Sequence, residues 1–176
     1  MTDRELVLAA QAGDADAFGQ LVVKHQRAAY GHAVALLGER EAAQDAVQDG
    51  FLAAFRALRR LDADRPFFPW FYVILRNRCY SILRQKRTTQ PLDESYLPAA
   101  ENTHSEDSAR LRQALTRLPV EDREILVLKY LDGRRYRQIA QMLGIPIGTV
   151  NSRLHAARRR LRDQLRDDRS LEARKP

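Results

Sequence analysis

The side chains best suited to molecular recognition lie in one stretch, residues 136–160, which reads YRQIAQMLGIPIGTVNSRLHAARRR. Apolar residues recur at helical spacing on both sides of Gly144, a residue type that tolerates the positive φ of a tight turn. This spacing predicts a helix-turn-helix, whose second helix enters the major groove of duplex DNA. The inward positions are Ile139, Ala140 and Leu143 before the turn, Ile145 at the corner, and Val150 and Leu154 after it.

The outward positions of the second predicted helix are polar, so they can hydrogen-bond to base edges and phosphates. A plain helical hairpin could share the apolar spacing, but it would not need a small residue at 140, a turn glycine and a polar face together. We therefore expect duplex DNA to bind here. The expected contacts are Thr149, Asn151, Ser152, Arg153 and His155, followed by the basic run Arg158, Arg159 and Arg160.

A second candidate nucleic-acid site combines aromatic and basic residues. Six of the chain's 13 aromatic residues lie in residues 67–80, and no acidic residue occurs between residues 65 and 92. Aromatic rings beside basic side chains suit unstacked bases, at roughly 1–3 kcal/mol for each stacked base. Arg76, Tyr80 and Arg84 recur every four residues and therefore share a helix face. We expect most of these rings to lie in the core, but Phe67 and Phe68 lie between prolines, so we expect these two in an exposed loop.

The elements that carry these residues are expected to be helical. Glycine and proline are sparse within long stretches and no alternating strand pattern occurs, which predicts an all-α fold. We expect two small helical domains at 1–87 and 109–170, joined by a flexible acidic linker at 88–108. That linker has two prolines and five acidic residues but no Lys or Arg. A charged tail at 171–176 completes the chain.

Local signals place the helices within the two predicted domains. Asp14 or Asp16 can cap a first helix that ends near Gly38. A second helix is expected from Glu39–Glu41, and a third from about Pro69 to about residue 87. The second helix carries one apolar face, made of Val47, Phe51, Ala54, Phe55 and Leu58. In the second domain, Leu111, Leu115 and Leu118 mark one helix and Pro119 opens the next.

Charge and composition narrow the class of partner. The net charge is +7 and the pI about 10.0, which favours a polyanionic partner. Residues 1–87 hold 13 basic and 10 acidic residues, and residues 109–176 hold 17 and 8. A single cysteine excludes an intramolecular disulfide. No stretch resembles a signal peptide or reaches the ~20 apolar residues of a membrane span, so we expect a cytoplasmic protein without direct membrane insertion.

The same residues argue against an enzyme. His25 and His32 are seven residues apart, which is too far for chelation of one metal, and the other two histidines are dispersed. Cys79 falls in an apolar stripe, as a buried thiol does. No glycine-rich phosphate loop is present. We therefore expect no catalytic residue, no metal and no cofactor.

Four segments, in order, resemble a bacterial RNA polymerase sigma factor of the extracytoplasmic-function (ECF) group, the minimal type with two domains. GDADAFGQLVVKH resembles the start of the family's first conserved region, and EAAQDAVQDGFLAAFRAL its core-polymerase-binding helix. FPWFYVILRNRCYSILRQKR resembles the segment that melts and reads the −10 element. The stretch from LRQALTRLPVEDREIL to NSRLHAARRRL resembles the region that reads the −35 element.

The resemblance implies partners and roles for particular residues. Core RNA polymerase would bind Gln44, Asp45, Gln48 and Asp49. Single-stranded −10 DNA would bind Phe67, Phe68, Arg76, Asn77, Tyr80 and Arg84, with the loop Leu61–Phe68 forming a pocket for a flipped base. Double-stranded −35 DNA would bind the helix-turn-helix. The family also implies an anti-sigma factor as a partner. Gln138 and Asn151 stand where the family often has Glu and Lys, which bears on the promoter sequence.

One alternative uses the same helix-turn-helix differently. A stand-alone transcription regulator would bind duplex operator DNA tightly without RNA polymerase. A response regulator would need an α/β receiver domain, whereas residues 1–87 are predicted to be helical. Binding to core polymerase is the observation that separates the sigma factor from the regulator.

Overall fold

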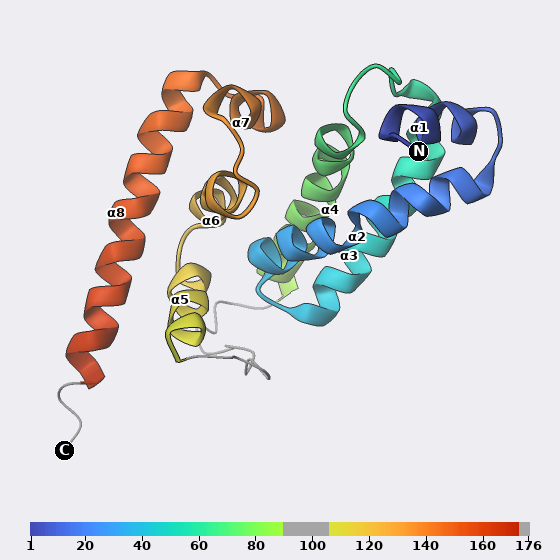
Figure 1. Cartoon of the computed structure of the whole chain (residues 1–176). Coiled ribbons are helices and arrows are strands. Elements are labelled where there is room, and N and C mark those ends of the chain that lie inside the picture. Colours follow the sequence, from blue (N-terminus) through green and yellow to red (C-terminus); the bar gives the residue numbers. More distant parts are fainter. Residues whose placement is uncertain (90–105, 173–176) are drawn as a thin grey trace. The chain divides into compact units, whose positions relative to one another are not determined.

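The structure, a computed structural model, describes residues 1–89 and 106–172, and every regular element in these ranges is helical (Figure 1). The chain divides into two compact units, Met1–Glu94 and Ser95–Pro176, which are described separately. The predicted all-α fold with two helical domains is thereby confirmed for the described ranges. No helix among them is both long enough and apolar enough to cross a membrane.

Three long helices enclose the core of the first unit. Helix α2 packs against both α3 and α4, and α3 also packs against α4. Leu21, Leu36 and Tyr72 are among the side chains that are fully buried between them. The elements of this unit are α1 (Asp3–Gln11), α2 (Ala15–Leu37), α3 (Arg40–Ala57), the 3-10 turn η1 (Leu58–Arg60) and α4 (Phe67–Thr89).

The ends of α2 follow the predicted signals. The Asp14 carboxylate accepts hydrogen bonds from the backbone N–H groups of Asp16 and Ala17, at 2.9 and 3.1 Å. These bonds satisfy donors that have no partner within the helix. Gly38 ends the helix at φ +76°, in the left-handed region that glycine adopts without strain.

Helix α1 is an element that the sequence reasoning missed. Thr2 and Glu5 form a capping box: the Thr2 hydroxyl accepts from the Glu5 N–H, and the Glu5 carboxylate accepts from the Thr2 N–H. Leu6, Val7 and Ala10 are buried against the rest of the unit. The spacing Thr-x-x-Glu before an apolar pair was the signal that could have revealed this helix.

The prediction that Phe67 and Phe68 are exposed is wrong. Helix α4 begins at Phe67 itself, and the two side chains are 0% and 5% exposed. Two histidines of α2 cover them: the His25 ring lies 5.3 Å from Phe67 and 5.6 Å from Phe68, and His32 lies 5.8 Å from Phe68. Phe71 and Tyr72 of the same helix also contact the pair, so rings from near and from distant parts of the chain together bury it. The flanking prolines did not indicate the two histidines.

The second unit is built around two helices that support the helix-turn-helix. Helices α6 and α5 both pack against the long α8. Ile125, Leu128 and Leu154 are among its fully buried side chains. The described elements are α5 (Glu106–Thr116), α6 (Val120–Leu126), a π-helical turn η2 (Val127–Leu131), α7 (Tyr136–Leu143) and α8 (Ile147–Glu172).

The expected linker and tail coincide only partly with the described helices. Residues 88–89 belong to α4 and residues 106–108 to α5, so the helices take in both ends of the predicted linker. Shifts of two or three residues are common because local sequence defines helix ends poorly. The rest of the predicted linker, at 90–105, and residues 173–176 of the tail lie outside the described residues.

Candidate nucleic-acid and polymerase interfaces

The helix-turn-helix is formed by α7, a turn at Gly144 and the start of α8. Gly144 has φ +66°, and its N–H donates to the Ala140 carbonyl. The Ile145 N–H donates to the same carbonyl at 3.1 Å, so the last turn of α7 is closed twice. A Cβ on Gly144 would meet nothing within 4 Å. Glycine is therefore required at this position by the backbone conformation and not by space.

The inner face of this motif is as the spacing predicts. Ile139, Leu143, Val150 and Leu154 are all buried, with exposures of 9% or less. Ala140 and Ile145 are half-buried at the turn. Because these apolar side chains lock α7 against α8, the outward side of α8 is a fixed surface.

That outward side carries the residues predicted to contact duplex DNA. Asn151, Ser152 and His155 are exposed, while Thr149 and Arg153 are half-buried. The Ser152 hydroxyl donates to the Thr149 carbonyl at 3.1 Å. The first turn of α8 holds no acidic residue, and the positive end of a helix dipole favours phosphate. The start of α8 is thus suited to an anionic duplex.

The basic run after this face divides into two roles. Arg158 and Arg159 are exposed, and Arg158 Nε donates to the Leu154 carbonyl at 3.3 Å. Arg160 instead forms an ion pair with Asp122 of α6, whose side chain is 5% exposed. The guanidinium of Arg160 therefore joins α8 to α6, which local sequence did not reveal.

The second candidate DNA face lies on α4. The Arg76 guanidinium sits over the Tyr80 ring, 4.6 Å from its centroid, as a cation–π pair. Arg84 follows one turn later and is exposed. Asn77 is exposed and three residues from Tyr80, so the two are neighbours on the helix surface. The structure thus brings four of the six predicted −10 residues onto one side of α4 and buries Phe67 and Phe68.

The loop before α4 is short and internally ordered. The Asp64 N–H donates to the Asp62 carboxylate at 3.0 Å, and the Arg65 N–H donates to the Asp62 carbonyl at 2.9 Å. This is an Asx turn, in which a side chain mimics a backbone turn. Asp62, Asp64, Arg65 and Pro66 are exposed, and they are the part of the predicted pocket that solvent reaches.

The predicted polymerase-binding residues lie on the outer side of α3. Gln44, Asp45 and Gln48 are exposed. Asp49 is half-buried and forms an ion pair with Arg78 of α4, with Arg78 Nε 3.0 Å from its carboxylate. Asp49 therefore already connects two helices within this unit.

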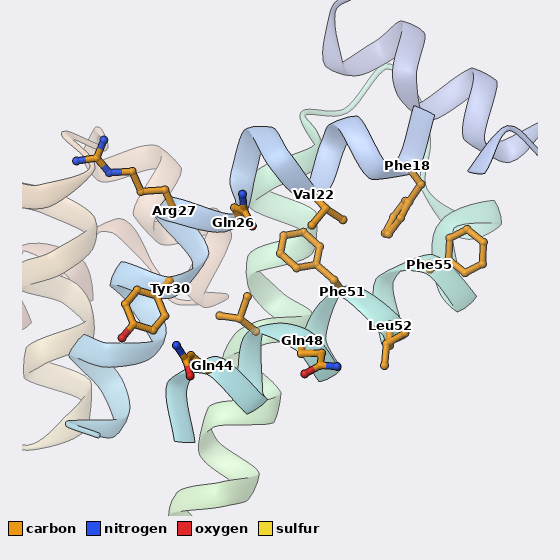
Figure 2. A pocket seen from close by; sticks show the side chains of 11 residues that line it. Phe18, Val22, Gln26, Arg27, Tyr30, Gln44, Gln48, Phe51, Leu52 and Phe55 are labelled. Atoms are coloured by element: carbon orange, nitrogen blue, oxygen red, sulfur yellow. The ribbon is translucent and has the colours of Figure 1, made fainter. Parts of the chain in front are cut away.

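Sequence reasoning missed an apolar groove beside these residues, between α2 and α3. The groove has a volume of about 700 Å³, and Gln44 and Gln48 stand at its edge (Figure 2). Leu52 and Phe55 line it and are 48% and 50% exposed. Phe55, on the apolar face predicted for this helix, packs its ring edge-on against Phe18 at 5.0 Å and stays half exposed. Leu52 lies one position away from the apolar face predicted for this helix. An apolar residue there was the sequence signal that could have revealed the groove.

Comparisons with known families agree with this arrangement. The family model described as "Sigma-70 region 2" matches residues 21–89, and that described as "Sigma-70, region 4" matches residues 108–161. The first match spans most of α2 and all of α3 and α4. The second contains the helix-turn-helix.

Individual relatives match over most of their length. The chain is 31% identical over 172 residues to "ECF RNA polymerase sigma factor SigW" of Bacillus subtilis, covering 88% of this chain and 92% of the relative. It is 38% identical over 164 residues to "ECF RNA polymerase sigma factor SigM" of Mycobacterium tuberculosis, covering 91% and 83%.

Solved structures with the same fold include two complexes. CnrH, in complex with the cytosolic domain of CnrY, matches with a TM-score of 0.75 and 31% identity, over 94% of this chain and 98% of that chain. Sigma factor RpoE, in complex with the anti-sigma factor NepR from Bartonella quintana, matches with a TM-score of 0.72 and 28% identity, over 85% and 96%.

Two helical units, one with a helix-turn-helix, together with both family matches define a sigma-70 type of transcription initiation factor. The chain belongs to the ECF group of RNA polymerase sigma factors. Its function is to direct promoter-specific initiation by RNA polymerase, and the alternative of a stand-alone regulator is set aside.

Proposed function

We propose that the two units divide promoter recognition between them, with α8 reading the duplex −35 element and α4 holding melted −10 bases. The observation that carries this proposal is that each unit presents its own exposed polar and basic helix face. Asn151 and His155 represent the face of α8, and Asn77 and Arg84 that of α4. The α8 face suits a DNA groove, and the α4 face suits unstacked bases.

The α8 face has the chemistry of a major-groove reader. Asn151, Ser152 and His155 offer donors and acceptors to base edges, while Arg158 and Arg159 are placed one to two turns later for phosphate. Because Gly144 and the buried face lock α7 to α8, these groups approach DNA as a rigid set, which limits the ordering cost of binding.

The α4 face has the chemistry of a single-strand binder. Tyr80 offers a ring for base stacking and Arg76 holds that ring on one side. Asn77 can form hydrogen bonds with a base edge. A flipped base needs contacts that offset a few kcal/mol of unstacking. We place such a base at the exposed loop of residues 61–66, and the buried Phe67 and Phe68 take no part in the contact.

The groove between α2 and α3 is proposed as the docking site for core RNA polymerase. An open apolar surface with amide groups at its edge suits a helical partner, because Leu52 and Phe55 can be buried while Gln44 and Gln48 form hydrogen bonds. Asp45 adds an exposed negative charge beside it. Asp49 contributes by holding α3 to α4 through Arg78.

Other partners follow from the relatives. CnrH and RpoE were each solved with a bound protein, the cytosolic domain of CnrY and the anti-sigma factor NepR. We extend a partner of this kind to the present chain. The chemistry of RNA synthesis belongs to the polymerase, so the chain itself acts as a non-enzymatic subunit, in the cytoplasm where polymerase and promoter meet.

The division of labour is tested by tethered DNA cleavage. The native Cys79 is buried, so a cysteine-reactive iron chelate can be directed to an introduced exposed cysteine. Asn151→Cys and Asn77→Cys chains are labelled, assembled with core polymerase and placed on a promoter. The unsubstituted chain, carried through the same labelling, is the control.

Asn151→Cys is expected to cut both strands around −35, and Asn77→Cys to cut the non-template strand around −10 only after opening. Cuts by both at the same element, or an exchange of the two patterns, would overturn the assignment.

A further inference from the structure

The loop proposed to receive a flipped base is held from outside by α1, the helix that precedes it by some fifty residues. The Gln11 amide, at the end of α1, donates to the Leu58 carbonyl at 2.9 Å and to the Leu61 carbonyl at 2.7 Å. Leu58 opens η1 and Leu61 opens the loop. The Leu58 carbonyl also accepts from the Leu61 N–H at 3.0 Å, so the Gln11 amide adds a second donor there and supplies one to the Leu61 carbonyl. One side chain thereby ties η1 and the first residue of the loop to α1.

A second contact reaches the tip of the loop. Arg4 Nε lies 2.7 Å from Asp64 Oδ1, and the Asp64 hydrogen bond raises the pKa of the Arg4 guanidinium. Asp64 is also the residue whose N–H closes the turn on Asp62. Both partners are exposed, so this ion pair adds little stability. It does define the position of Asp64 relative to α1.

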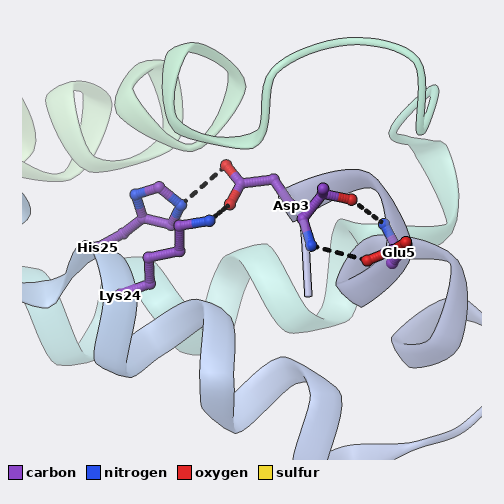
Figure 3. A network of polar contacts seen from close by, with 5 residues as sticks. Asp3, Glu5, Lys24 and His25 are labelled. Atoms are coloured by element: carbon purple, nitrogen blue, oxygen red, sulfur yellow. Dashed lines mark hydrogen bonds and ion pairs between the residues drawn. The ribbon is translucent and has the colours of Figure 1, made fainter.

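The N-terminal end of α1 is fixed to α2 above the start of α4. Asp3 forms an ion pair with Lys24 Nζ at 2.7 Å and its other carboxylate oxygen lies 3.0 Å from His25 Nε2 (Figure 3). The His25 ring lies against Phe67 and Phe68, the first two residues of α4. Helix α1 therefore contacts η1, the loop and the histidine that covers the start of α4.

Helix α1 is itself anchored well enough to serve as a support. Leu6 and Val7 are 2% and 1% exposed, and the capping box between Thr2 and Glu5 satisfies its first backbone donors. In Figure 1, α1 lies beside the segment that joins α3 to α4. The match to the sigma-70 region 2 model begins at residue 21, beyond α1.

We propose that α1 is a positioning element for base capture, in which Gln11 and Arg4 hold the loop of residues 61–66 in its base-receiving conformation. This inference rests on the proposed function, since it assumes that the loop receives a base. The loop's own Asx turn spans only Asp62 to Arg65, so contacts outside the loop are needed to aim it. A pre-aligned loop binds a base without first having to be ordered.

The test measures open-complex formation by the holoenzyme on a promoter fragment isolated by run-off transcription. Single abasic sites are placed in turn at each non-template position of the −10 element. Gln11→Glu removes both amide donors and brings a carboxylate against two carbonyls. Gln20→Glu makes the same change at an exposed site of α2 and is the matched control. Core affinity and binding to a duplex −35 fragment are measured alongside.

For the wild-type chain, one abasic position is expected to slow opening about tenfold, the equivalent of ~1.4 kcal/mol. Gln11→Glu should slow opening of intact DNA to a similar degree, and the abasic site should then add no further loss. Core affinity and −35 binding should be unchanged. Arg4→Ala should give a smaller loss of the same kind, which Arg4→Lys restores, and Gln20→Glu should match the wild type.

The possible failures are distinguishable. If no abasic site slows opening by the wild type, the proposal that this loop captures a base is wrong, whatever the effect of Gln11→Glu. If that position exists but Gln11→Glu keeps both the normal rate and the full abasic loss, the positioning role of α1 is wrong. If Gln11→Glu weakens core binding and −35 binding as much as opening, α1 is a general support of the unit and the inference is also wrong. Arg4→Ala repeats the test with an exposed residue.

Discussion

Arg160 of α8 forms an ion pair with the buried carboxylate of Asp122 in α6. This contact joins one arginine of a basic run to α6, although its side chain, like those of Arg158 and Arg159, remains exposed. The long α8 thereby gains an attachment to α6 beyond the face that we propose reads DNA.

The first prediction separates these arginines. Arg160→Ala leaves the Asp122 carboxylate buried without this partner, so the free energy of unfolding should fall by about 1–3 kcal/mol. Arg159→Ala removes the same charge from an exposed site and should change stability by less than ~0.5 kcal/mol. Arg159→Ala should, however, reduce the slope of the logarithm of promoter affinity against the logarithm of salt concentration by about one unit. Urea unfolding and salt titrations measure both, and equal destabilisation by the two substitutions would contradict this reading.

A second prediction concerns the turn of the helix-turn-helix. Gly144→Ala places a Cβ on a residue at φ +66°, where the strain is about 1–2 kcal/mol although no atom is in the way. Gly148→Ala is the matched control in α8, where added methyl has open space and helix formation favours alanine. It should be neutral or stabilise by up to ~1 kcal/mol. Thermal unfolding of both variants measures these changes in stability. Destabilisation by Gly148→Ala would contradict the expectation for that residue.

A third prediction concerns the groove between α2 and α3. Phe55→Ser should weaken binding to core polymerase about tenfold, because half of this ring is exposed in the groove and would be buried on docking. Val23→Ser changes an apolar residue of α2 that is 70% exposed and outside the groove. Fluorescence titration against core polymerase should show no loss for Val23→Ser. A loss shared by both would point to general instability and not to docking.

A fourth prediction compares the same change, asparagine to alanine, at one position in each of the two units. Asn77→Ala should slow promoter opening about tenfold while closed-complex binding stays near normal, because melted bases are contacted only after opening. Asn151→Ala should do the reverse and weaken closed-complex binding by roughly 1–3 kcal/mol. Permanganate reactivity reports opening, and gel retardation at low temperature reports the closed complex. Equal losses in both assays for Asn77→Ala would remove its role.

A fifth prediction follows from the charge cluster at the start of α1. Burial alone would raise the pKa of the Asp3 carboxyl, but the Lys24 hydrogen bond and the charges of His25 and Lys24 lower it below 3.8. A carboxyl with a lowered pKa stabilises the fold above its unfolded pKa, and this stability disappears as the pH falls through the folded value.

Asp3→Asn should therefore reduce the free energy of unfolding by ~0.2–1 kcal/mol at about pH 5, since the site is partly exposed. Relative to the wild type, this difference should shrink as the pH falls below about 3.8. Urea unfolding at about pH 5 and at pH values below about 3.8 measures this difference. A difference that stays constant or grows toward low pH would contradict the lowered pKa.

Sequence predicted the features that depend on near neighbours. Asp14 and Gly38 bound α2 because a side-chain cap and a left-handed residue act within a few positions. Gly144 with Val150 and Leu154 revealed the helix-turn-helix for the same reason, since one turn sets the relation of its two helices.

The features that sequence reasoning missed or predicted wrongly depend on distant parts of the chain. Phe67 and Phe68 are covered by histidines of α2 as well as by rings of their own helix, and no local pattern indicates those histidines. Arg160 could not be separated from Arg158 without knowing that Asp122 lies opposite it. The groove beside Phe55 is lined by side chains of both α2 and α3, so the apolar spacing of α3 alone does not show that this ring stays half exposed.

The central claim, promoter-directed initiation by this chain with core RNA polymerase, is tested most directly by run-off transcription on a pool of genomic promoter fragments. Purified core polymerase is assayed with the chain, without it, and with a chain carrying Phe55→Ser. We expect new specific start sites that share spaced −35 and −10 elements, that require the chain, and that weaken with Phe55→Ser. Absence of such starts, while the chain alone binds duplex DNA tightly at specific sites, would contradict it.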